Sequence, residues 1–233
     1  MNFSENTKQI QNKGKSFTVM LLEAEQPSCL VLFAAGRGGS PVRHLSLLRH
    51  LARKGCTIVA PYFDMLPSST PTKEELNGRI EQLEIVLNLY SHVHQTFIGI
   101  GHSIGATLLL TLAGGKAITF TGHHIGSNSI WKFERLVLLA PSVDFFLHPG
   151  AIETVDTQIY LRNGSKDTVT PPSKALLLKE TFEKQGQIEF LLDDEAGHFS
   201  YMDVLPPQIE DCQPDRSAFL SGLAEDISRF VIS

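Results

Sequence analysis

The sequence predicts an α/β fold, a three-layer sandwich built on a mostly parallel sheet. Short apolar runs with the composition of buried strands lie at 17–23, 28–35, 56–62, 96–100, 135–140, 158–162 and 188–192. Most of these runs are separated by segments of helical character. This alternation is typical of β-α-β units, whose right-handed crossovers place helices on both faces of the sheet. The length of 233 residues fits a single domain over 1–233.

Individual patterns place the expected helices. Pro41 suits the first position of a helix whose apolar face would hold Val42, Leu45, Leu48 and Ala52. Thr72 and Glu75 match a capping box ahead of a second amphipathic helix that extends to Tyr90. Further helices are expected at 106–113, 171–184 and 216–231, whereas the polar, glycine-rich segment 114–133 supports no assignment.

The composition excludes several classes of protein. Hydrophobic residues make up 42% and charged residues 19%, and a net charge of −5 argues against a nucleic-acid partner. No apolar run is long enough to predict a membrane span, and the first residues lack a signal-peptide pattern, so we expect a cytoplasmic protein without a membrane partner. Cys29, Cys56 and Cys212 form no C-x-x-C pair and are expected to be reduced thiols.

The strongest local signal is the sequence 101–105, which reads Gly-His-Ser-Ile-Gly. It follows an apolar strand and opens an apolar helix, which is the context that a G-x-S-x-G turn requires. Such a turn lifts the Ser103 hydroxyl out of the packed layers. It also leaves the Ile104 N–H at the start of a helix, where it can stabilise an oxyanion.

These residues resemble the nucleophile elbow of the α/β-hydrolase superfamily. The resemblance implies an acid and then a histidine downstream of the serine. The segment 164–171, G-x-x-D-x-V-x-P, resembles the acid loop of this superfamily and makes Asp167 the candidate. Asp144 is the rival, because it also follows a predicted strand. His198, in Gly-His-Phe after the last strand, resembles the family's histidine loop and is the candidate general base.

A second oxyanion donor is expected after the strand at 28–35. Family members often carry His-Gly there, whereas this chain has Ala35-Gly36-Arg37, so the Arg37 N–H is the positional match, to within about one residue. The Arg37 side chain either points to solvent or reaches the pocket. The same glycine-rich turn does not complete a G-x-G-x-x-G dinucleotide motif, because Pro41 stands at the last position.

The resemblance is to the capless end of the superfamily, near dienelactone-hydrolase-like and small carboxylesterase or thioesterase proteins. The segment 141–157 is too short to hold the usual lid domain. The resemblance implies a serine hydrolase acting on a small ester or thioester, with no metal and no cofactor. A peptidase or lyase on the same fold, and a binding protein that retains the pocket, remain open. The expected pocket walls are Phe145, Phe146, Phe199, Tyr201 and Met202, with Phe63 and Met65 as further candidates.

Overall fold

The apolar runs of the sequence form the central strands of one large sheet. The computed structural model describes residues 1–12, 14–90, 96–127, 129–183 and 188–233. Within these residues the sheet has eight strands, in the order β1-β2-β4-β3-β5-β8-β9-β10. The strands from β4 to β10 in this order run parallel, whereas β2 pairs antiparallel with both β1 and β4. Their bounds are β1 Phe3–Asn12, β2 Lys15–Ala24, β3 Cys29–Ala34, β4 Cys56–Pro61, β5 Phe97–His102, β8 Arg135–Leu139, β9 Gln158–Gly164 and β10 Ile188–Asp193.

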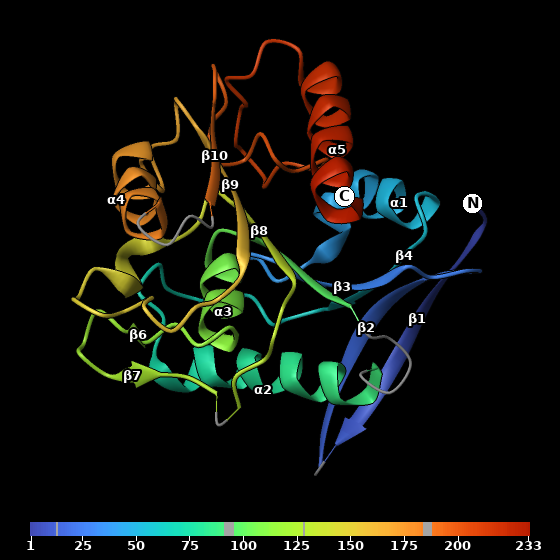
Figure 1. Cartoon of the computed structure of the whole chain (residues 1–233), viewed down its shortest axis with the longest axis horizontal. Helices are drawn as coiled ribbons and strands as arrows, with labels where there is room; N and C mark the ends of the chain where they lie inside the picture. Colours follow the sequence, from blue (N-terminus) through green and yellow to red (C-terminus); the bar gives the residue numbers. More distant parts are fainter. Residues whose placement is uncertain (13, 91–95, 128, 184–187) are drawn as a thin grey trace.

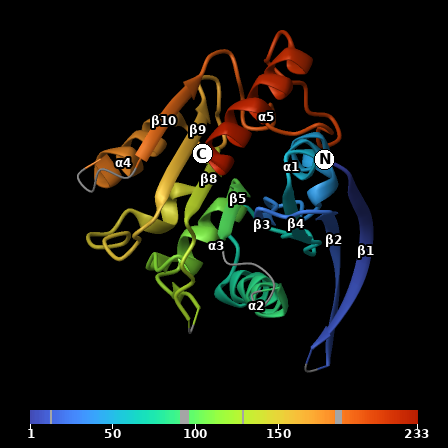
Figure 2. The same cartoon turned by 45° about the vertical axis from the view of Figure 1, so that its right-hand side comes forward.

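Helices cover both faces of this sheet and complete the predicted three-layer sandwich. On one face α1 (Leu45–Arg53) packs against α5 (Arg216–Ile232), and on the other α2 (Lys73–Tyr90) packs against α3 (Ile104–Leu112), as Figures 1 and 2 show. The helix α4 (Pro172–Glu183) packs against β9 and β10. Two of the central strands, β3 and β4, are buried along their whole length, as expected for strands covered on both sides.

The helix after Pro41 begins differently from the prediction. A 3₁₀ turn, η1 (Pro41–His44), precedes α1, and the buried face of α1 consists of Leu47, Leu48, Leu51 and Ala52. Val42 is exposed, so its expected place on the apolar face is wrong, whereas Leu45 is partly buried and packs against the core. The tighter turn shifts the phase of the first residues. The capping box is confirmed: the Thr72 N–H donates to Glu75 Oε2 at 2.7 Å, and the Glu75 N–H donates to Thr72 Oγ1 at 3.2 Å.

Two features were not predicted from the sequence. The edge strand β1 precedes the first expected strand, and the segment 114–133 contains a small two-stranded sheet of β6 (Ala117–Ile118) and β7 (His124–Ile125). The predicted end of α4 at Lys184 lies outside the described residues.

The parallel strands end together at one edge of the sheet, where binding sites form in open α/β folds. Between β8 and β9, where every residue is described, the regular structure is one short 3₁₀ turn, η2 (Val143–Phe146). No lid domain is inserted there, as expected. Within the described part of the chain, none of the helices has the length and apolar character needed to span a membrane.

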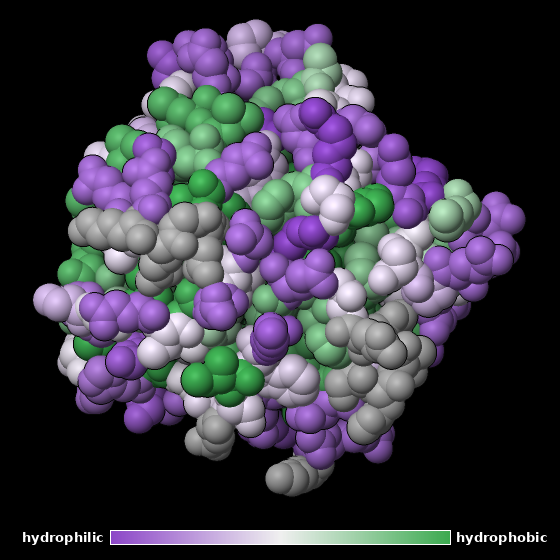
Figure 3. Space-filling model, in the orientation of Figure 1, coloured by the Kyte–Doolittle hydropathy of each residue, from purple (hydrophilic) through white to green (hydrophobic). Residues whose placement is uncertain are grey.

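Apolar side chains are exposed at the edge of the sheet that β10 forms. Leu176 and Leu177 on α4 and Leu191 and Leu192 on the edge strand β10 are all partly open to solvent. Figure 3 shows hydrophobic surface gathered where Figure 1 places α4 and β10. The strand β10 is therefore the least covered of the parallel strands, with only Asp193 fully buried.

Candidate active site

Ser103 occupies the turn between β5 and α3 in a backbone conformation that few residues adopt. Its φ of 55° and ψ of −123° lie in a region that is strained for residues other than glycine. The Ser103 N–H donates to the Leu139 carbonyl at 2.9 Å, which ties the turn to the neighbouring strand β8. The strain and this tether hold the hydroxyl above the ends of the strands.

The two glycines of the motif are required by close packing. A Cβ on Gly101 would lie 2.5 Å from the Ala106 nitrogen, and a Cβ on Gly105 would lie 2.0 Å from the Ala34 carbonyl oxygen. Neither backbone contact can yield, so only glycine lets β5, α3 and β3 approach this closely.

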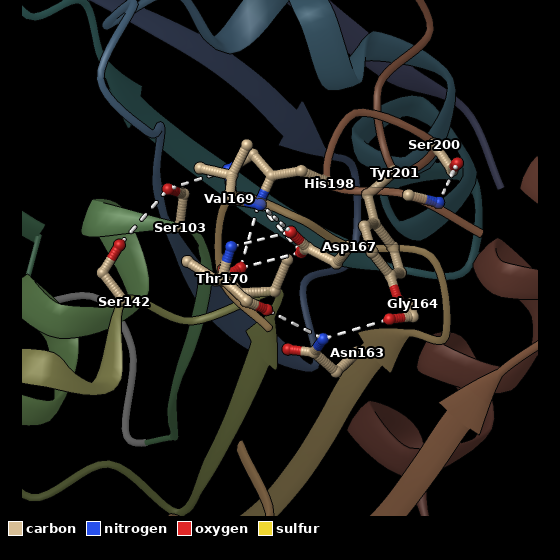
Figure 4. Close-up of polar contacts among 12 residues, drawn as sticks. Ser103, Ser142, Asn163, Gly164, Asp167, Val169, Thr170, His198, Ser200 and Tyr201 are labelled. Carbon is tan, nitrogen blue, oxygen red and sulfur yellow. Dashed lines mark hydrogen bonds and ion pairs between the residues drawn. The ribbon is translucent and has the colours of Figure 1, made fainter. Parts of the chain in front are cut away.

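The structure brings Ser103, His198 and Asp167 into one hydrogen-bonded chain (Figure 4). Ser103 Oγ lies 3.1 Å from His198 Nε2, and His198 Nδ1 lies 2.9 Å from Asp167 Oδ2. All three residues are buried, Ser103 least so. This is the arrangement in which an imidazole can take the hydroxyl proton while a carboxylate fixes its tautomer.

Asp167 is held by its own loop. Its Oδ1 accepts hydrogen bonds from the N–H groups of Val169 at 2.8 Å and Thr170 at 2.7 Å. Thr170 Oγ1 lies 2.7 Å from Asp167 Oδ2, 2.9 Å from His198 Nδ1 and 3.1 Å from the Ala140 carbonyl oxygen. Thr170 is a site residue that the sequence reasoning missed, although the D-x-x-T spacing is a known turn pattern that could have indicated it.

The rival acid, Asp144, lies elsewhere. Its carboxylate accepts two hydrogen bonds from Lys174 Nζ on α4, at 2.6 and 2.8 Å. The structure therefore brings Asp167, and not Asp144, to the imidazole. Asp193 is also engaged, since Arg162 Nε donates to it at 3.0 Å and the Tyr201 hydroxyl donates to it at 2.8 Å.

His102, the second residue of the motif, supports the histidine loop from beneath. Its Nε2–H donates to the His198 carbonyl at 2.9 Å, and its ring lies 4.9 Å from that of His198 and 5.1 Å from that of His44. Burial first, and then the two neighbouring imidazoles, hold the pKa of His102 well below its ordinary value. His102 is therefore neutral at pH 7 and serves as a donor to the loop.

The two segments expected to supply oxyanion donors lie next to Ser103. Ile104 is the first residue of α3, where a backbone N–H has no partner within the helix. The turn after β3 also lies against the serine, because a Cβ on Gly36 would be 3.2 Å from both Ser103 Cβ and His102 Nδ1. The Arg37 side chain is exposed, and its guanidinium donates to the carbonyls of Leu66 at 2.9 Å and Pro67 at 2.7 Å. Those bonds hold it on the loop that follows β4.

Two of the expected pocket residues lie in the hydrophobic core: Tyr201 is only 1% exposed, and Phe145 is also buried. Tyr201 is held there because its hydroxyl donates to the buried Asp193. Phe199 is partly exposed and lies 5.0 Å from the His198 ring, so it remains a candidate wall.

The other candidate walls are spread around the site. Met202 and Phe63 are largely buried, whereas Met65 is exposed. Phe146 lines a cavity of about 340 Å³ between η2, the following loop and α4. Val143 lines the same cavity. The residue before it, Ser142, has its hydroxyl oxygen 3.4 Å from that of Ser103.

A metal centre has no candidate in the described ranges. No three His, Cys, Asp or Glu side chains in them gather closely enough to hold an ion. The adjacent histidines His123 and His124 belong to no such group, and His123 Nδ1 lies 3.0 Å from the Thr121 hydroxyl.

Comparison with known proteins places the fold. No family model and no curated protein matches the chain. Among solved structures, a predicted CIB-like hydrolase from Thermoplasma acidophilum matches 98% of this chain and 100% of its own, with 14% identity and a TM-score of 0.68. Esterase 2 from Thermogutta terrifontis, phosphorylated by paraoxon, matches 98% of this chain and 93% of its own, with 13% identity and a TM-score of 0.71.

An α/β serine hydrolase without lid from Xanthomonas campestris is similar over 98% of this chain and 96% of its own, with 16% identity and a TM-score of 0.66. The agreement runs over nearly the full length of each chain, although few residues are shared. The chain therefore has the α/β-hydrolase fold, as the serine motif indicated, in a form without a lid, as the short segment 141–157 indicated.

Proposed function

We propose that this α/β-hydrolase-fold chain is a serine hydrolase that cleaves a small to medium carboxylic ester or thioester. One observation carries the proposal: Ser103 Oγ, His198 Nε2 and Nδ1, and Asp167 Oδ2 form a continuous hydrogen-bonded chain with contacts of 3.1 and 2.9 Å. A binding protein would need no base aligned with a hydroxyl.

In the proposed first half of the reaction, His198 Nε2 takes the hydroxyl proton as Ser103 Oγ attacks the acyl carbon. Asp167 accepts the Nδ1–H hydrogen bond and stabilises the imidazolium that forms. The tetrahedral intermediate then collapses. The bond to the leaving alcohol or thiol breaks, the leaving group receives the proton from His198, and the acyl group remains on Ser103.

Backbone N–H groups of Ile104 and Arg37 are the proposed donors to the oxyanion of the intermediate. In the second half, His198 takes a proton from water, the resulting hydroxide attacks the acyl-enzyme, and Ser103 recovers its proton as the acid leaves. This chemistry uses side chains and water, so it requires no metal and no organic cofactor.

The proposed partner is a small-molecule substrate. Support for an ester comes from the similar structures, which include an esterase phosphorylated by paraoxon, an organophosphate. Thioesters are included in the proposal because the motifs also resemble those of small thioesterase proteins. The three cysteines are unpaired, which agrees with the reduced thiols proposed for a cytoplasmic protein.

The test is covalent labelling of Ser103. A fluorophosphonate probe should add one mass increment to the wild-type chain and none to Ser103→Ala. Ser103→Ala and Asp167→Asn should each lower kcat for p-nitrophenyl esters by about 10⁴-fold with folding intact, whereas Asp144→Asn should lower it far less.

Two results would contradict the proposal. One is a wild-type chain that neither reacts with the probe nor hydrolyses any p-nitrophenyl ester or acyl-CoA thioester across a range of acyl lengths. The other is a Ser103→Ala chain that keeps more than about a tenth of the wild-type rate.

A further inference from the structure

A buried arginine outside the catalytic chain contacts the oxyanion turn. Arg79 lies on α2 and is only 4% exposed. Its Nη1 donates to the Gly36 carbonyl at 2.9 Å, and its Nη2 donates to the carbonyls of Arg37, also at 2.9 Å, and Asp64. Its guanidinium lies over the Phe63 ring, 4.8 Å from the centroid. One side chain thus holds the turn after β3 and the loop after β4.

The partners of Arg79 are unusual for a buried charge. In the described part of the chain its hydrogen-bond partners are carbonyl oxygens, and no carboxylate forms an ion pair with it. Burial lowers the pKa of Arg79 to about 10, so the group remains charged at pH 7. Burying a cation without an ion pair carries a free-energy penalty. A packing role alone would be served better by an apolar side chain of the same length.

The geometry of one peptide group connects Arg79 to the chemistry. The Gly36 carbonyl and the Arg37 N–H belong to the same peptide group, and none of the described peptide bonds is cis. In a trans peptide the C=O and N–H bonds point in opposite directions. A carbonyl directed at Arg79 on α2 therefore directs the Arg37 N–H to the other side of the turn. The turn lies against Ser103, as the Gly36 contacts show.

We propose that Arg79 is a positioning residue for the oxyanion hole. Its guanidinium fixes the peptide between Gly36 and Arg37, and its positive charge polarises that peptide so that the N–H becomes a stronger donor. The inference rests on the proposed hydrolase function and adds to it a residue that does not touch the substrate.

The contacts around Arg79 make the two loops one unit. The Phe63 N–H donates to the Gly39 carbonyl at 3.0 Å, and the Leu66 N–H donates to the Arg37 carbonyl at 3.1 Å. Gly39 has a positive φ of 74°, and a Cβ there would lie 2.1 Å from the Phe63 carbonyl oxygen. The guanidinium of Arg79 therefore acts on two loops that already contact each other through their backbones.

The experiment compares Arg79→Met and Arg79→Lys with a matched control, Arg135→Met. Arg135 also donates to backbone carbonyls, those of Val231 at 2.9 Å and Ser233. It is the first residue of β8, so it lies at the opposite end of this strand from the site. The measurements are thermal unfolding, kcat and KM for p-nitrophenyl acetate and butyrate, and the inhibition constant of an aliphatic trifluoromethyl ketone. That ketone forms a tetrahedral adduct with the serine whose oxyanion occupies the hole.

Removal of a whole oxyanion donor lowers kcat by about 10²- to 10³-fold, so a residue that positions one donor should matter less. Arg79→Met should lower kcat about 10- to 100-fold with KM nearly unchanged, and should weaken ketone binding by a similar factor. Arg79→Lys keeps the charge but cannot hold all three carbonyls, and both losses should be smaller. Arg135→Met should lower the unfolding temperature and leave kcat and ketone binding as in the wild type.

The proposal is overturned if folded Arg79 variants keep kcat within about twofold of wild type, or lose kcat without a matching loss of ketone affinity. If Arg79→Met does not fold, the same comparison of kcat with ketone affinity is made on Arg79→Lys. A wild-type chain that hydrolyses no ester refutes the proposed function instead. An active wild type whose Arg79 variants behave like Arg135→Met refutes only the role of Arg79.

Discussion

Acid should destabilise this protein through a buried histidine next to the site. His44 ends the turn η1, is 1% exposed, and packs 4.9 Å from the Phe33 ring and 5.1 Å from the His102 ring. Burial lowers its pKa from 6.5 to about 4; the hydrogen bond to the Tyr201 carbonyl opposes this shift, and the charge of Arg43 adds to it.

The sign of the effect follows from proton uptake. The folded pKa lies below the unfolded value, so between pH 6.5 and 4 the unfolded chain binds a proton that the folded chain does not. The stabilisation is present above pH 6.5 and is lost as the pH falls toward 4. From these two values the loss at pH 5 is about 2 kcal/mol for His44 alone. His102, whose pKa is also lowered by burial, adds a loss of the same sign.

The assay is urea unfolding at pH 7.5 and pH 5.0 for wild type and His44→Asn. Asparagine cannot titrate but keeps a donor for the Tyr201 carbonyl, which His44 Nδ1 contacts at 3.0 Å. Lost packing affects both pH values equally. The change in unfolding free energy between the two pH values should therefore be about 2 kcal/mol smaller in the variant. His124→Asn, at an exposed position, is the control and should match wild type. Equal pH dependence in wild type and His44→Asn would refute the reasoning.

Two other substitutions test the supports of the site. Thr170→Val keeps the shape of the side chain but removes the hydroxyl beside Asp167 and His198, so kcat for a p-nitrophenyl ester should fall about tenfold with little change in KM; an unchanged kcat would assign Thr170 to packing alone. Gly105→Ala places a Cβ about 2 Å from the Ala34 carbonyl and should lower the unfolding temperature and abolish fluorophosphonate labelling. A folded, labelled Gly105→Ala chain would show that the turn can relax.

The sequence was most informative where one element is buried on both faces. The runs that became β3, β4 and β8 are nearly continuous apolar segments, and their positions agree with the structure to within about two residues. The edge strand β1, which pairs with β2, has the polar sequence FSENTKQIQN with only Ile10 buried. It therefore has no alternation of apolar and polar residues from which a strand could be predicted. The strands β6 and β7 were not predicted because they have two residues each, too few to show a period.

The site shows the same division between local pattern and tertiary contact. Ser103, Asp167 and His198 stand in loops whose local sequence resembles known motifs, and the structure brings the three together. Arg79 is different, because it lies in an amphipathic helix and its partners are backbone carbonyls, which have no sequence signature. The pocket residues could not be selected by aromatic character alone, since the same apolar character that would line a cleft also favours burial in the core, where Tyr201 lies.

The packing around the motif gives its second residue, His102, a structural role beside Ser103. Ser103 depends on the glycines for its position, whereas His198 sits on a loop that begins after the edge strand β10. His102 connects the two, because it precedes Ser103 in the chain and donates to the carbonyl of His198. The ring of His44 also packs against His102, and burial lowers the pKa of both histidines. Protonation of either ring at low pH should therefore destabilise the fold and disturb the loop that holds His198.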